Sequence, residues 1–291
     1  MENLKNIDKI LILDFGSQFT QLIARRIREN KVYSEIHTFN VSMDFIKKFN
    51  AKGIILSGGP SSVYEKDAPK INKELFEIGI PILGICYGMQ LIVHSLGGKV
   101  EKAKKREYGN AEIKIIKNDR IFKSFEKNNI VWMSHGDSIK SIPKGFNLTA
   151  KTSNTNYCAI ENKEKNIYGI QFHPEVAHTK NGIKIIKNFI FDICKCKKNW
   201  NMNSFIEYEI KNIKEIVKDK NVILGLSGGV DSSVAAVLIE KAIGKQLKCI
   251  FVNTGLLRKN EEKKVIEVFR DNFKIDLIYK DSSKRFLNKL K

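Results

Sequence analysis

A cysteine stands at a predicted strand-to-helix junction, in the sequence GICYG. Gly-x-Cys-x-Gly has the form of a nucleophile elbow, a sharp turn that presents a nucleophile at the edge of a sheet. Gly84 and Gly88 leave out side chains where such a turn would clash, and the N-terminus of the following helix favours a thiolate on Cys86. The pattern therefore indicates a nucleophile for attack on an amide or ester carbonyl.

Candidates for the partners of this nucleophile follow another predicted strand, in the sequence YGIQFHPE. His173 can act as general base, and Glu175 can orient the imidazole and stabilise its charged form. Attack on a carbonyl also creates an oxyanion, which needs preorganised N–H donors. Gly59, in the loop ILSGGPSS, and Tyr87 can each present a backbone N–H. Alone, Cys86 could be a small buried thiol and His173 a hydrogen-bonded strand-end histidine, but the combination favours catalysis.

A second Leu-Ser-Gly-Gly stretch opens the sequence SGGVDSS, which lies between a predicted strand and a predicted helix. Its successive backbone N–H groups can form an anion-binding nest at the helix N-terminus, and its serine hydroxyls add donors. Asp231 suits a phosphate loop if Mg²⁺ bridges its carboxylate and the phosphates. The alternative is a plain helix N-cap and turn. The residues expected to bind ATP are Ser227, Gly228, Gly229, Val230, Asp231, Ser232 and Ser233.

The elements that must position these residues alternate between short apolar runs and segments of helical period. Runs at 9–15, 53–59 and 81–88 read as strands with helices between them, which implies a parallel sheet covered on both faces. Residues 157–161 and 167–172 read as an antiparallel hairpin, so the sheet is mixed. A polar break at Cys194–Asn203 separates a second α/β unit. We expect one domain at residues 1–199 and an incomplete parallel one at 200–291, with about three strands.

The formal charge of +19 could indicate nucleic-acid binding. The lysines, however, are spread along the chain, whereas a nucleic-acid footprint concentrates on one face with interleaved aromatics. The densest runs, Lys99–Glu107 and Lys195–Trp200, are expected at loop or helix ends as solvated surface. The charge therefore favours anionic substrates such as nucleotides, and no nucleic-acid partner is expected.

The five cysteines are scattered, which argues against a disulfide framework and favours a reducing cytoplasm. Cys158 and Cys249 lie in strand-like runs and are expected in the core, and Cys194 and Cys196 lack a second pair at zinc spacing. His94, in the helix after the elbow, is expected to pack or to face solvent. No segment approaches the roughly 18 uninterrupted apolar residues of a membrane span, so no membrane partner is expected.

The motifs SGGP, GICYGMQ and HPE resemble those of the class I glutamine amidotransferases. Members of that family hydrolyse the glutamine side-chain amide through a cysteinyl thioester and pass ammonia to a partner domain. The resemblance implies that Cys86 is the nucleophile, His173 the base and Glu175 its orienting acid. SGGVDSS and FVNTGLLRKNE resemble the pyrophosphate loop and the following strand of the N-type ATP pyrophosphatases, which adenylate an oxygen and release pyrophosphate.

Together with LDFGSQ, WMSHGD, HPEVAHT and DICKC, these motifs are similar to those of the glutamine-hydrolysing GMP synthase family. That resemblance implies a class I amidotransferase domain with a mixed sheet flanked by helices. An adenine-nucleotide α-hydrolase-like parallel α/β domain follows, truncated here relative to the family pattern. It also implies amination of xanthosine 5′-phosphate (XMP), in which ATP activates the purine and glutamine-derived ammonia displaces AMP. A homodimer is expected if the family's C-terminal domain is present, or else a separate synthetase portion.

Two alternative functions and the placement of one residue stay open from the sequence. The chain could be a glutaminase or regulatory binding subunit that feeds ammonia to a separate synthetase or senses nucleotide through SGGVDSS. It could also be an ATP pyrophosphatase that acts on RNA, although the glutaminase motifs argue against this. Within WMSHGD, His135 is either a strand-end histidine with Asp137 hydrogen-bonded nearby, or a residue close to the glutaminase site or a domain interface.

Overall fold

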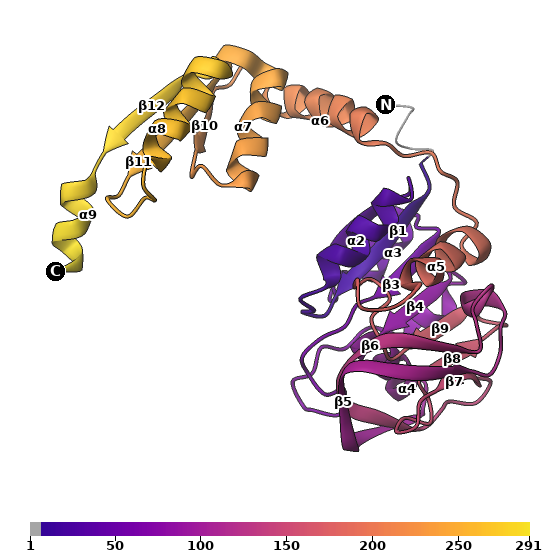
Figure 1. Ribbon diagram of the computed structural model, residues 1–291. Coiled ribbons are helices and arrows are strands. Elements are labelled where there is room, and N and C mark those ends of the chain that lie inside the picture. Colours follow the sequence, from indigo (N-terminus) through magenta and orange to yellow (C-terminus); the bar gives the residue numbers. More distant parts are fainter. Residues whose placement is uncertain (1–6) are drawn as a thin grey trace. The chain divides into compact units, whose positions relative to one another are not determined.

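The computed structural model describes residues 7–291, apart from the side chain of Lys104. The chain divides into two compact units, Met1–Asn201 and Met202–Lys291 (Figure 1). Each unit has a hydrophobic core of its own.

Within the described residues, the first unit builds a nine-stranded sheet in the order β2-β1-β3-β4-β9-β8-β7-β5-β6. The first five strands in this order pair in parallel, and the remainder pair antiparallel. The parallel strands are β1 (Lys9–Asp14), β2 (Tyr33–Thr38), β3 (Gly53–Leu56), β4 (Ile82–Ile85) and β9 (Ile167–Ile170). The antiparallel strands are β5 (Lys99–Ile115), β6 (Asn128–Ser141), β7 (Asn147–Lys151) and β8 (Ala159–Asn162).

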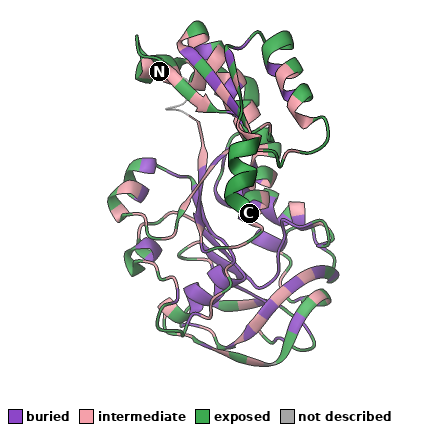
Figure 2. Ribbon diagram, turned by 90° about the vertical axis from the view of Figure 1, so that its left-hand side faces the viewer, coloured by how far each residue is buried: buried purple, intermediate pink, exposed green. Residues whose placement is uncertain are grey.

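Strands β1, β3, β4 and β9 are buried on both faces, because they are continuous apolar runs, whereas the edge strand β2 is more polar and only partly buried. In β1, Ile10 and Ile12 join one core, and Leu11 and Leu13 join the other. Helices α2 (Thr20–Glu29) and α5 (Gly182–Lys187) supply apolar side chains to the first core, and α3 (Met43–Phe49) and α4 (Tyr87–Ser95) supply the second. Figure 2 shows the buried residues gathered along these central strands.

Shorter helical segments complete the first unit. They are 3-10 turns at Lys73–Glu77 and Arg120–Phe122, and a π-helical continuation of α5 at Asn188–Ile193. The mixed sheet flanked by helices confirms the predicted fold class.

One sequence prediction is wrong at the antiparallel end. The basic run Lys99–Glu107 was expected at a loop or helix end, but it forms the first half of the 17-residue strand β5. Most side chains of the run are charged, so its sequence shows no alternation of apolar and polar residues that would predict a strand. Pairing with β6, a tertiary contact, makes it a strand.

The second unit forms a parallel sheet in the order β10-β11-β12 within the part of the chain that the structure describes. Its core contains Leu226, Cys249, Phe251 and Phe269. The elements are α6 (Met202–Val217), β10 (Val222–Gly225), α7 (Val230–Ile243), β11 (Leu247–Asn253), α8 (Glu261–Ile266, continued by π-helical turns at Glu267–Asn272), β12 (Leu277–Asp281) and α9 (Ser283–Leu290), with a 3-10 turn at Gly244–Gln246. This short parallel sheet confirms the predicted class of the second unit.

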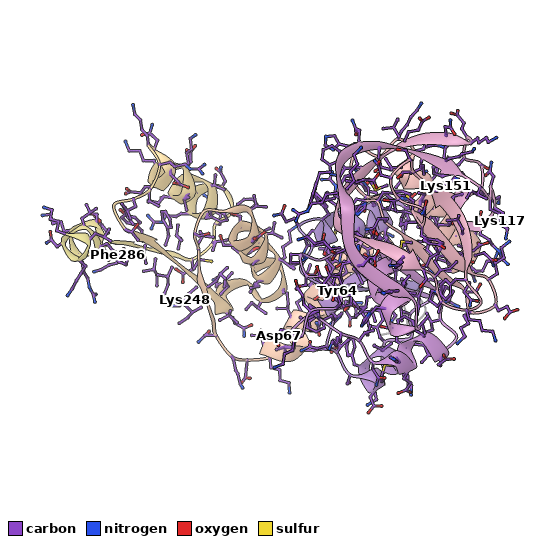
Figure 3. All side chains as sticks on the ribbon, turned by 90° about the horizontal axis from the view of Figure 1, so that it is seen from below. Tyr64, Asp67, Lys117, Lys151, Lys248 and Phe286 are labelled. Atoms are coloured by element: carbon purple, nitrogen blue, oxygen red, sulfur yellow. The ribbon has the colours of Figure 1, made fainter. Side chains whose placement is uncertain are left out.

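Basic side chains are distributed over both units. Lys117 and Lys151 lie on the first unit and Lys248 on the second (Figure 3). Among the described residues, no helix is both long enough and apolar enough to cross a membrane.

Candidate active site

The elbow at Cys86 joins β4 to α4 in a backbone conformation that L-residues rarely adopt, with φ 52° and ψ −107°. The backbone N–H of Cys86 donates to Ile170 O of β9 (2.8 Å), which fixes the turn to the neighbouring strand. Both flanking glycines are required sterically. A Cβ on Gly84 would lie 2.6 Å from Gly88 C, and one on Gly88 would lie 2.3 Å from Leu56 O. The Gly-x-Cys-x-Gly spacing therefore follows from the packing of this turn.

Three neighbouring parallel strands bring the predicted catalytic residues to one edge of the sheet. Strands β3, β4 and β9 are adjacent, and Gly59, Cys86 and His173 follow their carboxyl ends. All three residues line one cavity of about 760 Å³. The carboxyl edge of a parallel sheet is where α/β proteins bind their ligands.

The imidazole of His173 is held from several sides. Its Nδ1–H donates to Glu175 Oε1 (2.8 Å), and both side chains are buried. The backbone N–H of His173 donates to Trp132 O (3.1 Å), and Thr179 Oγ1 donates to His173 O (2.5 Å). Because Glu175 occupies Nδ1, the other ring nitrogen is the one free to exchange a proton with Cys86.

The electrostatic setting of His173 favours its charged form. Burial by itself would lower the pKa of His173, but contacts with Cys86 and Glu175 outweigh it and raise the pKa to about 10. The balance of these effects therefore favours the imidazolium over the neutral ring.

The two predicted oxyanion donors also lie at this cavity. Tyr87 is the first residue of α4, and the N–H groups of a helix's first turn have no acceptor within the helix. Gly59 packs closely against the residue that follows β1, since a Cβ there would lie 2.6 Å from Phe15 O. Both predicted donors therefore lie at the cavity that also contains Cys86.

Several residues of the cavity were missed by the sequence reading. Gln171 Nε2 donates to Cys86 Sγ (3.6 Å), and Gln90 Nε2 donates to Gln171 Oε1 (3.2 Å). Tyr64 OH donates to Asp137 Oδ1 (2.8 Å), and Arg106 also lines the cavity. Gln171 lies two positions before His173, in YGIQFHPE, and Gln90 lies in GICYGMQ, so both stood inside stretches already singled out.

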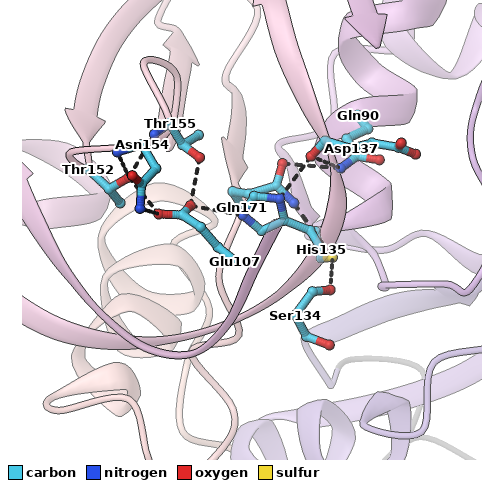
Figure 4. A network of polar contacts seen from close by, with 10 residues as sticks. Gln90, Glu107, Ser134, His135, Asp137, Thr152, Asn154, Thr155 and Gln171 are labelled. Carbon is cyan, nitrogen blue, oxygen red and sulfur yellow. Dashed lines mark hydrogen bonds and ion pairs between the residues drawn. The ribbon is translucent and has the colours of Figure 1, made fainter. Parts of the chain in front are cut away.

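His135 lies in the middle of β6, so the expectation of a strand-end histidine is wrong; the residue instead lines the cavity that contains Cys86 and His173. Its Nδ1–H donates to Asp137 O (2.8 Å), and its Nε2 lies 3.1 Å from Glu107 Oε2 (Figure 4). Glu107, the last residue of the basic run, is buried opposite His135 in the β5–β6 register. No sequence pattern marked it, because its partners lie on distant segments. The side chains that donate to its carboxylate are those of Thr152, Asn154 and Thr155.

The remaining cysteines and His94 fit their structural interpretation. Cys158, Cys194, Cys196 and Cys249 are buried free thiols, and His94 is exposed on α4. Among the described residues, no group of three or more His, Cys, Asp or Glu side chains could hold a metal ion.

The sequence SGGVDSS spans the loop after β10 and the first turn of α7, with Gly229 as the N-cap residue. Gly228 has φ +80°, a conformation that glycine adopts without strain. Ser227 Oγ and Ser232 Oγ are 2.9 Å apart, and Ser233 Oγ donates to Gly229 O (2.6 Å). Asp231 is exposed in the first turn of α7. One carboxylate beside hydroxyls and a helix N-terminus fits a magnesium ion held mainly by phosphates.

Comparisons with known proteins match the two parts of the chain to two different families. The family model described as "Glutamine amidotransferase class-I" matches residues 11–193, and the model described as "NAD synthase" matches residues 201–283. The chain is 79% identical over 285 residues to a glutamine-hydrolysing GMP synthase of Brachyspira hyodysenteriae, with 98% of this chain and 55% of that protein covered. It is 53% identical over 286 residues to one of Clostridium botulinum, with 98% and 56% covered.

The chain thus spans about half the length of the curated relatives it matches. Among solved structures, a Thermoplasma acidophilum protein named as one subunit of a GMP synthase is 32% identical. It has a TM-score of 0.57, and the match covers 70% of this chain and 98% of that one.

Proposed function

Because the chain belongs to the class I glutamine amidotransferase family, we propose that its first unit hydrolyses the side-chain amide of glutamine. Cys86 is the nucleophile, His173 the general base and acid, and Glu175 the residue that orients the imidazole. The observation that carries the proposal is the cavity that combines a strained cysteine elbow with the buried His173–Glu175 pair.

Each group has a defined task in this reaction. The sulfur of Cys86 attacks the carboxamide carbon while its proton resides on His173, and the oxyanion accepts from the N–H groups of Gly59 and Tyr87. The imidazolium then donates its proton to the departing nitrogen, which leaves as ammonia. Water hydrolyses the resulting thioester with His173 as base, and glutamate is released. Glu175 keeps Nδ1 protonated throughout, so the other nitrogen performs every transfer.

The cavity also suits the two charged groups of a free amino acid. Asp137 and Arg106 both line it, and they could bind the α-ammonium and the α-carboxylate of glutamine respectively. Tyr64 holds Asp137 through a hydrogen bond of 2.8 Å. These opposite charges favour a zwitterionic substrate over a peptide amide.

Glutamine hydrolysis by the purified chain tests this half of the proposal. Cys86→Ala should abolish both glutamate release and thioester accumulation. Cys249→Ala is the matched control, since Cys249 is a buried thiol in the core of the second unit, and it should retain glutamine hydrolysis in the folded protein. Hydrolysis that survives Cys86→Ala would refute the assignment.

For the second unit we propose binding of Mg–ATP by Ser227–Ser233, with Asp231 facing the magnesium. Magnesium would neutralise phosphate charge. The joined function is amination of XMP to GMP, with release of AMP and pyrophosphate. Support comes from the match to the NAD synthase model and the 79% identity to a protein named GMP synthase. The five free cysteines support a cytoplasmic location.

A second candidate is a glutaminase that supplies ammonia to a separate synthetase polypeptide. It is favoured by the match to the Thermoplasma acidophilum protein, which is named as one subunit of a synthase and which this chain covers almost completely. GMP formation from XMP, Mg–ATP and either glutamine or ammonium distinguishes the two. Activity of the chain alone supports the joined function. Activity that requires an added synthetase portion supports the second candidate. The absence of GMP in both cases refutes the joined function and leaves a glutaminase that serves a different synthetase.

A further inference from the structure

Building on the proposed glutaminase, we propose that Glu107 and His135 form a positioning pair that holds the Ser134–Asp137 stretch of β6 against the nucleophile. The pair lies outside the Cys86–His173–Glu175 triad. It acts through the backbone of β6 rather than by touching the substrate amide.

His135 bridges two acceptors that belong to different strands. Asp137 O on β6 accepts from Nδ1 at 2.8 Å, and a carbonyl oxygen can only accept, so Nδ1 must carry a proton. On the other side, Nε2 lies 3.1 Å from the Glu107 carboxylate on β5. The ring therefore folds back onto its own strand and ties that strand to β5. The Ser134–Asp137 backbone has little freedom to move.

This stretch reaches the sulfur of Cys86 by two routes. Figure 4 labels Ser134, Asp137, Gln90 and Gln171, which take part in them. In its thiol form, Cys86 Sγ donates to Ser134 O directly (3.5 Å). Asp137 O accepts from Gln90 Nε2 (3.5 Å), Gln90 contacts Gln171, and Gln171 Nε2 donates to Cys86 Sγ. Strand β6 therefore contacts the nucleophile directly through Ser134 and indirectly through Gln90 and Gln171. A shift of β6 would change both contacts.

Glu107 is anchored firmly enough to act as the fixed end. Thr155 Oγ1 donates to it at 2.6 Å, Thr152 Oγ1 at 2.9 Å and Asn154 Nδ2 at 3.3 Å. Burial by itself would raise the pKa of Glu107, but hydrogen bonds from His135 and these three residues outweigh it and lower the pKa to about 2. The carboxylate stays charged, and charged hydrogen bonds hold their partners more strongly than neutral ones.

Glu107→Gln is the informative substitution, because it keeps the side-chain shape and removes the charge. Glu112→Gln is the matched control, since Glu112 is exposed on the same strand. In folded Glu107→Gln protein we expect kcat for glutamine hydrolysis to fall by about ten- to a hundredfold, because small displacements of a reacting group reduce rate that strongly. Glu107→Asp should recover part of the loss. The double variant with His135→Gln should be no slower than the slower single variant.

A second measurement, alkylation of Cys86, tests the position of the thiol without requiring glutamine turnover. The rate at which iodoacetamide alkylates Cys86 should fall in Glu107→Gln and stay unchanged in Glu112→Gln. A role in folding alone would lower the melting temperature without changing kcat or the alkylation rate of the folded fraction. If Glu107→Gln does not fold, Thr155→Val removes one donor and should reduce both rates severalfold.

The positioning role is wrong if both rates in folded Glu107→Gln, or in Thr155→Val used in its place, stay within about twofold of the control. It is also wrong if the losses in the Glu107→Gln and His135→Gln single variants simply add. A wild-type chain that hydrolyses no glutamine contradicts the proposed function instead, and the alkylation comparison then still decides the positioning role.

Discussion

Replacing Glu175 with Gln should lower the pKa of His173 while leaving the ring in place. The carboxylate accepts from Nδ1 at 2.8 Å. A glutamine amide oxygen at the same position can still accept that hydrogen bond but carries no charge. The substitution therefore isolates the electrostatic part of the contact.

The size of the effect follows from the balance at His173. Its pKa is raised from 6.5 to about 10, against the effect of burial. That difference corresponds to roughly 5 kcal/mol in favour of the imidazolium. Cys86 and Glu175 share it, and a charged hydrogen bond contributes about 1.5–3 kcal/mol. Loss of the charge should lower the midpoint by about one to two pH units.

Titration of the histidine ring signals by NMR, between about pH 5 and pH 11, measures this directly. The chain has five histidines, so the spectrum is simple. His173 should still be protonated at pH 8 in the wild type, and the exposed His94 should give the same signal in both proteins. A wild-type midpoint near 6.5, or the same midpoint in Glu175→Gln, would refute the reasoning.

The raised pKa of His173 also makes the free energy of unfolding depend on pH. Because the folded pKa of His173 is raised, its stabilising contribution is complete below about pH 6.5 and is lost as the pH rises through about 10. The difference in unfolding free energy between wild type and Glu175→Gln should therefore shrink over that window, as measured by urea denaturation.

Three further outcomes are expected. Gly88→Ala should destabilise the first unit by about 1–3 kcal/mol in urea denaturation, since its Cβ would lie 2.3 Å from a carbonyl oxygen of β3; an unchanged midpoint would contradict the elbow packing. Asp231→Asn should weaken Mg–ATP binding about tenfold by calorimetry while glutamine turnover stays the same, and equal affinity would exclude the metal role. Lys117→Met should cost about 2 kcal/mol in thermal unfolding, because buried Glu161 would keep only the more distant Lys163 (3.7 Å); no change would show that Lys163 suffices.

The parts of the fold that the sequence predicted are those whose signals are local. The strand at the elbow and the loop into α7 each stand in one contiguous motif, and β1, β3 and β4 are continuous apolar runs. The structure brings Cys86 and His173 to one cavity, although their catalytic roles remain predictions.

Strand β6 shows why the rest could not be predicted. Alternate residues of β6 are buried, which is the ordinary signal of a strand with one face on a core. Three of the buried positions, however, hold Asn129, His135 and Asp137 rather than apolar residues. Polar groups gathered around a site interrupt the pattern that would have revealed the strand. Glu107 was missed for a different reason: each of its partners lies at least 28 residues away in sequence, so no local motif connects them.

The backbone of Cys86 has a consequence for how this chain can change over evolutionary time. A side chain held at φ 52° and ψ −107° stores on the order of 1–3 kcal/mol of strain, which the two cores of the first unit must offset. Glycine would relieve that strain and abolish the proposed chemistry in a single substitution. Selection for stability and selection for turnover therefore act in opposite directions at this one position.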